Sequence, residues 1–73
     1  MMTADQARAE LEKLALKYLK SNSELPGLVK IINDKTRPGL PVRGVLESIR
    51  TQNVVDYDDT EKEIIEELIY LYG

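Results

Sequence analysis

The sequence contains neither cysteine nor histidine, and this absence excludes two common ways of stabilising a small protein. Disulfides need cysteine, and structural zinc sites are built mainly from cysteine and histidine side chains. A chain of 73 residues buries only about 60% of the surface that its unfolded form exposes. We therefore expect a single helical domain over residues 1–73 that gains its stability from regular helix packing or from self-association.

Long apolar runs are absent as well. No stretch approaches the roughly 20 apolar residues that a membrane-spanning helix needs. The start, MMTADQARAE, has no basic flank leading into an apolar segment, as a signal peptide would. These features predict a soluble protein of the cytoplasm with no membrane partner.

Charge is distributed unevenly along this small acidic chain, whose formal net charge is −3. Residues 1–29 are balanced, residues 30–50 carry an excess of three positive charges, and residues 51–73 carry an excess of six negative charges. A basic middle beside an acidic end predicts either two different partner surfaces or a protein that neutralises its own charge.

Apolar residues recur every three or four positions in four segments, a pattern that predicts helices at about 4–20, 24–34, 41–51 and 60–72. The second and third helices are too short to span the first. We therefore expect an all-α fold, a compact irregular bundle of four short helices rather than an up-and-down bundle. The predicted core consists of Leu11, Leu14, Tyr18, Leu28, Val29, Ile32, Val45, Leu46, Ile49, Ile65 and Leu68.

Several helix starts are marked by side chains that can accept hydrogen bonds from the free N–H groups of a helix N-terminus. These are Thr3 paired with Gln6, Ser23, and Asp58 or Asp59, with the pairs Asp58/Glu61 and Thr60/Glu63 at capping-box spacing. Pro41 begins the third helix, because its fixed φ is already helical. Before it, residues 37–40 suit a type II turn with Pro second and Gly third. Val54-Val55 fits either a short extended piece or a buried connector.

Catalytic groups are scarce. Without histidine or cysteine, only Ser21, Ser23 and Ser48 could serve as serine nucleophiles, and no base is placed beside them. The closely spaced carboxylates all lie around the solvated start of the last helix. The sequence therefore predicts a protein that is not an enzyme and holds no cofactor.

A calcium loop is the one metal motif that the sequence partly matches. Asp56, Asp58, Thr60 and Glu67 stand at positions 1, 3, 5 and 12 of a twelve-residue loop. Position 6 requires glycine for its sharp turn, and Glu61 stands there. We interpret the stretch as an acidic helix start and expect no metal site.

Titration with Ca²⁺ tests this interpretation. Amide chemical shifts should move little and without saturation, because the loop lacks its turn glycine. Saturation at micromolar Ca²⁺, with large shifts confined to residues 56–67, would contradict it.

A helix-turn-helix layout is suggested by the second helix, the glycine-containing turn and the third helix. Its basic residues would be Lys35, Arg37, Arg43 and Arg50. Glu47, however, shares the outer face of the third helix with Arg43 and Arg50, which is the spacing of surface ion pairs. The adjoining acidic segment would also repel phosphates. Nucleic-acid binding through residues 30–50 is therefore the alternative, and the sequence argues against it.

Apolar residues on the outer faces of helices give the favoured hypothesis. The apolar arc of the last helix takes in Ile64, Ile65, Leu68, Ile69, Leu71 and Tyr72, and Tyr70 projects opposite it among Glu63, Glu66 and Glu67. Leu16 projects opposite the apolar stripe of the first helix, unless that helix is contacted from two sides and buries it. Ile31 lies on the flank of the second helix's stripe.

These residues predict a binding surface, since tyrosine is enriched at protein interfaces. We expect a non-enzymatic interaction module, such as an adaptor, inhibitor or regulator. Its partner would be another protein or a second copy in a homodimer. A structural subunit of a larger assembly is a further alternative.

Overall fold

The computed structural model of the chain describes residues 2–37, 39–52 and 56–72. These residues form four α-helices and no strand: α1 (Ala4–Tyr18), α2 (Leu25–Ile32), α3 (Val42–Gln52) and α4 (Asp59–Tyr72). The all-α prediction is confirmed, and each predicted helix boundary is within two residues of the observed one. Val54-Val55 and Pro38, the second residue of the predicted turn, lie outside the described residues.

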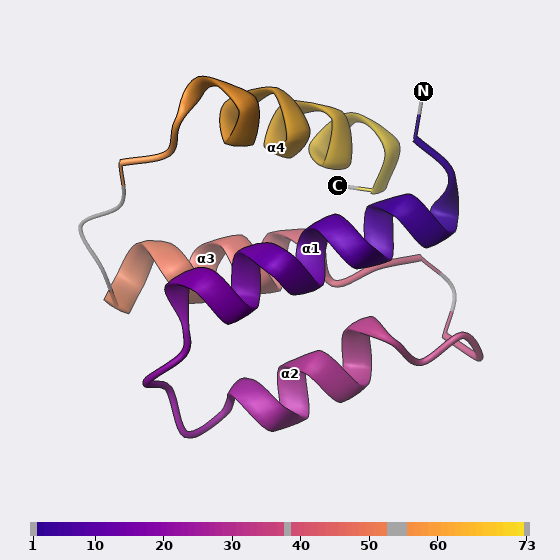
Figure 1. The fold of residues 1–73 in the computed structure, drawn as a ribbon. Coiled ribbons are helices and arrows are strands. Elements are labelled where there is room, and N and C mark those ends of the chain that lie inside the picture. Colours follow the sequence, from indigo (N-terminus) through magenta and orange to yellow (C-terminus); the bar gives the residue numbers. More distant parts are fainter. Residues whose placement is uncertain (1, 38, 53–55, 73) are drawn as a thin grey trace.

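Helix α1 is central to the arrangement. It packs against α2 and α3, and α3 packs against α4. The bundle is flat, measuring 28 × 27 × 15 Å between Cα atoms. It is irregular in helix length, as predicted, with helices of 15, 8, 11 and 14 residues. Successive helices nevertheless alternate in direction, which the sequence did not lead us to expect (Figure 1).

Two helix starts are held by the predicted capping boxes. In α1, Gln6 N donates to Thr3 Oγ1 over 3.1 Å, and Thr3 N donates to Gln6 Oε1 over 2.9 Å. In α4, Glu61 N donates to Asp58 Oδ1 over 2.7 Å, and Asp58 N donates to Glu61 Oε1 over 3.1 Å. Asp58 is therefore the capping residue, and Asp59 is the first residue of the helix.

The predicted cap of α2 was wrong. The N-cap residue is Glu24, whose side chain makes no capping hydrogen bond. Asn22 Oδ1 instead accepts a hydrogen bond of 2.7 Å from Glu24 N. An asparagine side chain that captures the N–H two residues later closes a local turn, and this turn, rather than Ser23, leads the chain into α2.

The end of α2 is tied to α1 by one arginine. Arg8 Nη1 donates to the backbone oxygens of Ile32 and Asp34, over 2.9 and 3.3 Å. Carbonyls at a helix C-terminus lack partners within the helix, so these bonds satisfy groups that would otherwise need water. After this point Gly39 adopts a φ of +74°, the left-handed value that the third residue of a type II turn needs.

The core is entirely aliphatic. Its buried residues are Ala7, Leu11, Leu14, Ala15, Leu19, Ile32, Val42, Val45, Ile49 and Leu68, and no polar or charged residue is buried within the described part of the chain. Among the other predicted core residues, Tyr18, Leu28, Leu46 and Ile65 are partly buried against this cluster, and Val29 is partly exposed.

Four buried residues were missing from the predicted core. Ala7, Ala15 and Leu19 are buried because α1 is contacted by both α2 and α3, which widens its buried arc. Val42 is buried at the first turn of α3. The apolar spacing of the first helix includes Ala7, Ala15 and Leu19, but how much of so wide a stripe is buried depends on which helices meet.

Two leucines of α1 offer a direct test of this burial. Leu11→Ala should lower the free energy of unfolding by roughly 2–5 kcal/mol, because it removes a fully buried side chain and leaves a cavity. Leu16→Ala, in the same helix but at a 48% exposed position, should change it by no more than about 0.5 kcal/mol. Urea unfolding followed by circular dichroism measures both, and equal losses would contradict the assignment.

Candidate functional site

Two of the apolar residues predicted to be exposed are exposed. Tyr70 on α4 is 80% exposed and Leu16 on α1 is 48% exposed, so the alternative of a buried Leu16 is excluded. Ile31 on α2 is partly buried. The remaining large apolar side chain that is exposed in the described residues is Ile69, at 42%.

Leu16 and Tyr70 do not form one patch. Helices α1 and α4 run in opposite directions (Figure 1), and Lys17 Nζ contacts Glu61 Oε2 at 2.9 Å. Leu16 therefore lies near the start of α4. Tyr70 is nine residues beyond Glu61, about 14 Å farther along the helix axis. Each residue has to be considered with its own neighbours.

A groove between α3 and α4 lies beside Tyr70's neighbour Ile69. Its volume is about 290 Å³, and it is lined by Arg43, Leu46, Glu47, Arg50 and Ile69. Leu46 and Ile69 supply apolar surface from the two helices, and the charged residues all come from α3. Ile69 of α4 thus meets Arg43 and Arg50, the two α3 arginines of the nucleic-acid hypothesis, at one place.

The exposure of Ile69 corrects the sequence interpretation, which placed this residue in the apolar arc of the last helix. Leu68 is the buried residue of α4, and α4 packs against α3 at the margin of a flat bundle. One edge of the arc is left uncovered as a result. A helical wheel shows the width of an apolar arc and does not show how much of it a neighbour covers.

The ion pair expected on the outer face of α3 is present. Arg50 Nη2 lies 2.9 Å from both carboxylate oxygens of Glu47. This hydrogen bonding raises the pKa of Arg50 above its usual value. Both side chains are well exposed, and an exposed pair of this kind adds little stability.

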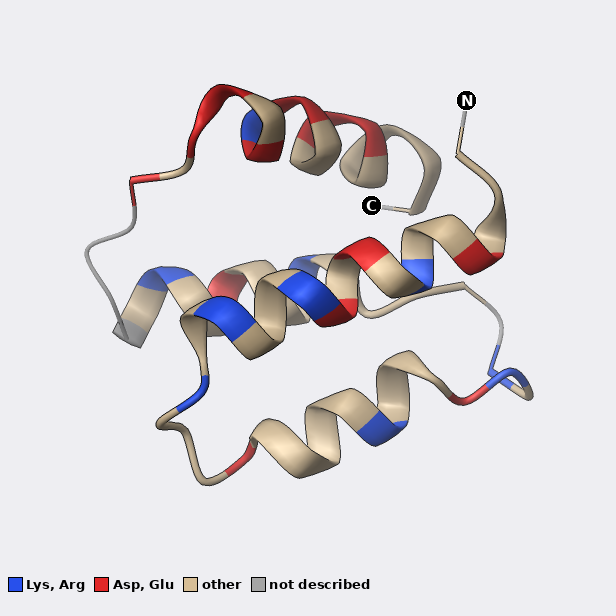
Figure 2. Ribbon diagram, in the orientation of Figure 1, with Lys and Arg blue, Asp and Glu red and all other residues tan. Residues whose placement is uncertain are grey.

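The acidic residues predicted around Tyr70 divide into two groups. Glu63 and Glu66 are exposed on α4. Glu67 is partly buried, and its Oε1 accepts a hydrogen bond of 2.8 Å from Met2 N. Acidic residues gather along α4, whereas α1 carries both signs (Figure 2). Glu63 and Glu66 are therefore the ones that face solvent near Tyr70.

The basic residues of the nucleic-acid alternative are also divided. Arg43 and Arg50 line the groove on α3, while Lys35 and Arg37 lie in the loop between α2 and α3. That loop spans residues 33–41, longer than the three or four residues typical of a helix-turn-helix. Helix α2 packs chiefly against α1, so the two helices are not arranged as a recognition pair.

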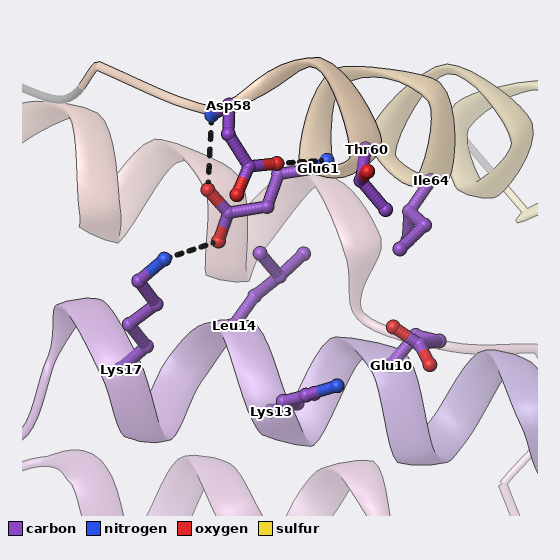
Figure 3. Close-up of a pocket in the computed structure, with 8 residues that line it drawn as sticks. All are labelled: Glu10, Lys13, Leu14, Lys17, Asp58, Thr60, Glu61 and Ile64. Carbon is purple, nitrogen blue, oxygen red and sulfur yellow. Dashed lines mark hydrogen bonds and ion pairs between the residues drawn. The ribbon is translucent and has the colours of Figure 1, made fainter.

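A second cluster, which sequence reasoning missed, joins α1 to α4 around Glu61. Its Oε1 accepts from the Tyr18 hydroxyl over 2.6 Å, and its Oε2 accepts from Lys17 Nζ over 2.9 Å. The Tyr18 and Tyr57 rings meet edge to face, with centroids 5.2 Å apart and planes at 83°. A groove of about 190 Å³ adjoins the Lys17–Glu61 pair (Figure 3).

These contacts shift several pKa values. The Tyr18 hydrogen bond, with those from Lys17 and Asp58 N, lowers the pKa of Glu61 to about 2. The bonds to Glu61 raise the pKa values of Lys17 and Tyr18, and burial raises that of Tyr57. A carboxylate with so low a pKa is a poor proton acceptor at neutral pH, so the cluster suits a structural tie between α1 and α4.

The stretch that partly matched a calcium loop contains the first turns of α4, with Asp58 as its cap. In the part of the chain that the structure describes, no group of three or more carboxylate, histidine or cysteine side chains is arranged to hold a metal ion. None of the described helices is both long and apolar enough to cross a membrane.

Comparison of the chain with known protein families, curated proteins and solved structures finds no match.

The Glu61 cluster predicts a specific pH dependence. The folded pKa of about 2 lies below the ordinary value of 4.5, so ionised Glu61 stabilises the fold fully above about pH 5 and loses this effect as the pH falls toward 2. Glu61→Gln should lower the free energy of unfolding at pH 7 by up to about 3 kcal/mol. The difference from wild type should shrink between pH 5 and pH 2.

The matched control is Glu63→Gln, at an exposed position two residues along the same helix. It should change stability by no more than about 0.5 kcal/mol. Urea unfolding at a series of pH values measures both variants. If the loss in Glu61→Gln is the same at pH 3 as at pH 7, the carboxylate is not the source of the stabilisation.

Proposed function

We propose that the chain is a small non-enzymatic protein–protein interaction module that acts through the outer side of α4 and the adjoining α3–α4 groove. The observation that carries this proposal is the exposure of Tyr70, at 80%. Tyrosine has a large, rigid side chain with a polar tip, so it loses little entropy when it is buried in an interface. It is among the residues that contribute most at binding hot spots.

The surroundings of Tyr70 support the proposal further. A single exposed apolar residue is ordinary on a protein surface. Tyr70, however, adjoins the partly exposed Ile69, which shares the groove with Leu46. Charged residues of α3 and α4 border this apolar strip. An apolar centre with a polar rim is the usual organisation of a protein interface.

An adaptor, inhibitor or regulator would use such a surface transiently, and a structural subunit of a larger assembly would use it permanently. A cytoplasmic location is part of the proposal. It is supported by the absence of cysteine, since such a chain gains nothing from an oxidising compartment.

Nucleic-acid binding through Arg43 and Arg50 has weaker support. Arg50 is engaged by Glu47, and the adjoining outer face of α4 carries Glu63 and Glu66. Affinity for nucleic acid depends on neutralising phosphates, so a carboxylate row beside the arginines opposes it. The same mixture of charges is compatible with a protein partner that carries both signs.

Tyr70→Ala tests the proposed function. The free energy of unfolding should change by no more than about 0.5 kcal/mol, since the side chain is exposed. Affinity for the partner should fall about thirtyfold, which corresponds to a hot spot worth about 2 kcal/mol. The partners are first recovered from source cells on immobilised wild-type protein, and the affinity of each is then measured by calorimetry.

Lys30→Ala, at an exposed position on α2, is the control and should retain the same partners as wild type. Leu16→Ala tests the opposite end of the bundle. If only this variant loses affinity for the partner, the binding site does not lie on α4. Unchanged partners and affinities in folded Tyr70→Ala would remove Tyr70 from the proposal. A loss of several kcal/mol in stability would show that the side chain supports the fold.

A further inference from the structure

The outer faces of α3 and α4 carry opposite charges on the two sides of one apolar strip. On α3, Arg43 and Arg50 are seven residues apart and therefore share a face. On α4, Glu63, Glu66 and Tyr70 are spaced by three and four residues and likewise share a face. The strip between them is formed by Leu46 and Ile69, which line the same groove.

We call Arg43 and Arg50 the basic row, and Glu63, Glu66 and Tyr70 the acidic row. Each row also contains one residue of the other sign. Glu47 stands between the two arginines and contacts Arg50, and Lys62 is exposed on α4 near the two glutamates. The net charge is nevertheless positive on the α3 side and negative on the α4 side. The same asymmetry runs through the sequence, with three excess positive charges in residues 30–50 and six excess negative charges in residues 51–73.

Two copies of this surface can face each other so that opposite charges meet, if they are related by a suitable two-fold axis. A two-fold axis that runs along the apolar strip, parallel to α3 and α4, exchanges the two sides of the surface. The basic row of one copy then faces the acidic row of the other, and the two apolar strips meet at the axis. An axis across the helices would place like charges together, so only the first arrangement is favourable.

We infer that this surface binds a second copy of the chain in a two-fold symmetric dimer, an inference that rests on the proposed interaction function. A partner that fits this surface has to place acidic residues opposite the α3 side, apolar residues opposite the strip and basic residues opposite the α4 side. A uniformly acidic partner would be repelled by Glu63 and Glu66, and a uniformly basic one by Arg43 and Arg50. The α3–α4 surface of a second copy presents its rows in this order.

The spacing along the helices indicates which residues meet. Helices α3 and α4 pack together and run in opposite directions (Figure 1). If Leu46 and Ile69 are taken as level, a rise of about 1.5 Å per residue places Arg50 within about one residue of the level of Glu66. The two-fold axis preserves levels, so Arg50 of each copy faces Glu66 of the other. Arg43 lies about two residues from the level of Tyr70, within reach of its ring.

The size of the α3–α4 surface limits the expected affinity of the dimer. Helices of 11 and 14 residues are about 16 and 21 Å long. A stable interface buries about 800 Å² on each partner, roughly a sixth of the protein's total of 4996 Å². Two short helices lie near the lower limit of that range, so we expect a dimer that dissociates reversibly on dilution.

A charge-swap experiment tests this arrangement by sedimentation equilibrium from micromolar to millimolar protein. Wild type should dimerise. Arg50→Glu and Glu66→Arg should each weaken self-association at least about tenfold, because each variant places like charges together twice in the dimer. An equimolar mixture of the two variants should form a heterodimer with near wild-type affinity, since both contacts then pair opposite charges.

Controls separate position from net charge. Lys30→Glu and Glu24→Arg make the same changes of net charge at exposed positions outside the α3–α4 surface and should dimerise like wild type. Tyr70→Ala should weaken the dimer at least about thirtyfold.

Circular dichroism checks that each variant is folded. If a charge-reversed variant is not folded, the neutral variants Arg50→Gln and Glu66→Gln replace it. These neutral variants should weaken self-association by a smaller factor.

The inference fails if wild type is monomeric throughout, if the swapped variants dimerise like wild type, or if mixing them restores nothing. If wild type is monomeric but binds a protein from the cell extract that Tyr70→Ala no longer binds, a different protein occupies the surface. The proposed function would then stand without the dimer. If wild type is monomeric and Tyr70→Ala binds the same proteins as wild type, both the dimer and the proposed function are overturned.

Discussion

Helix α1 has to bury two sides at once, because α2 packs on one side and α3 on another. Alanines at positions 7 and 15 are fully buried beside Leu11 and Leu14, so the neighbouring backbones can come close without large side chains between them. Helix α4 packs against α3 rather than as a third close neighbour of α1, so the main helix contacts follow the order α2–α1–α3–α4. Helix α4 then reaches the core through Leu68 and leaves its opposite side to solvent.

Glu61 connects local and tertiary structure in one side chain. Its Oε1 accepts the hydrogen bond from Asp58 N that completes the capping box, and the same carboxylate accepts from Lys17 and Tyr18 on α1. Forming the first turn of α4 and docking that turn onto α1 are therefore coupled. A carboxylate that is only 12% exposed is stabilising in this position because each oxygen has a donor.

The sequence predicted the local features well. Helix boundaries and both capping boxes follow from patterns within a few residues, and the exposure of Leu16 and Tyr70 follows from helical periodicity. The Glu61 cluster could not be predicted, because Tyr18 lies 43 residues away. The exposure of Ile69 and its place beside Arg43 and Arg50 likewise depend on which sides of α3 and α4 meet. Those relations are tertiary, and the separate helical patterns carry no information about them.

Helix α2 is anchored unequally at its two ends. Its C-terminal end holds the helix's one buried residue, Ile32, and receives the Arg8 hydrogen bonds. Its N-terminal end has no side-chain cap, and Gly27 stands in the helix with open space where a Cβ would lie. A glycine in a helix costs up to about 1 kcal/mol relative to alanine. Fraying of α2 from Leu25 should therefore need less free energy than global unfolding, and we expect the amides of this end to exchange with solvent while the rest of the bundle stays folded.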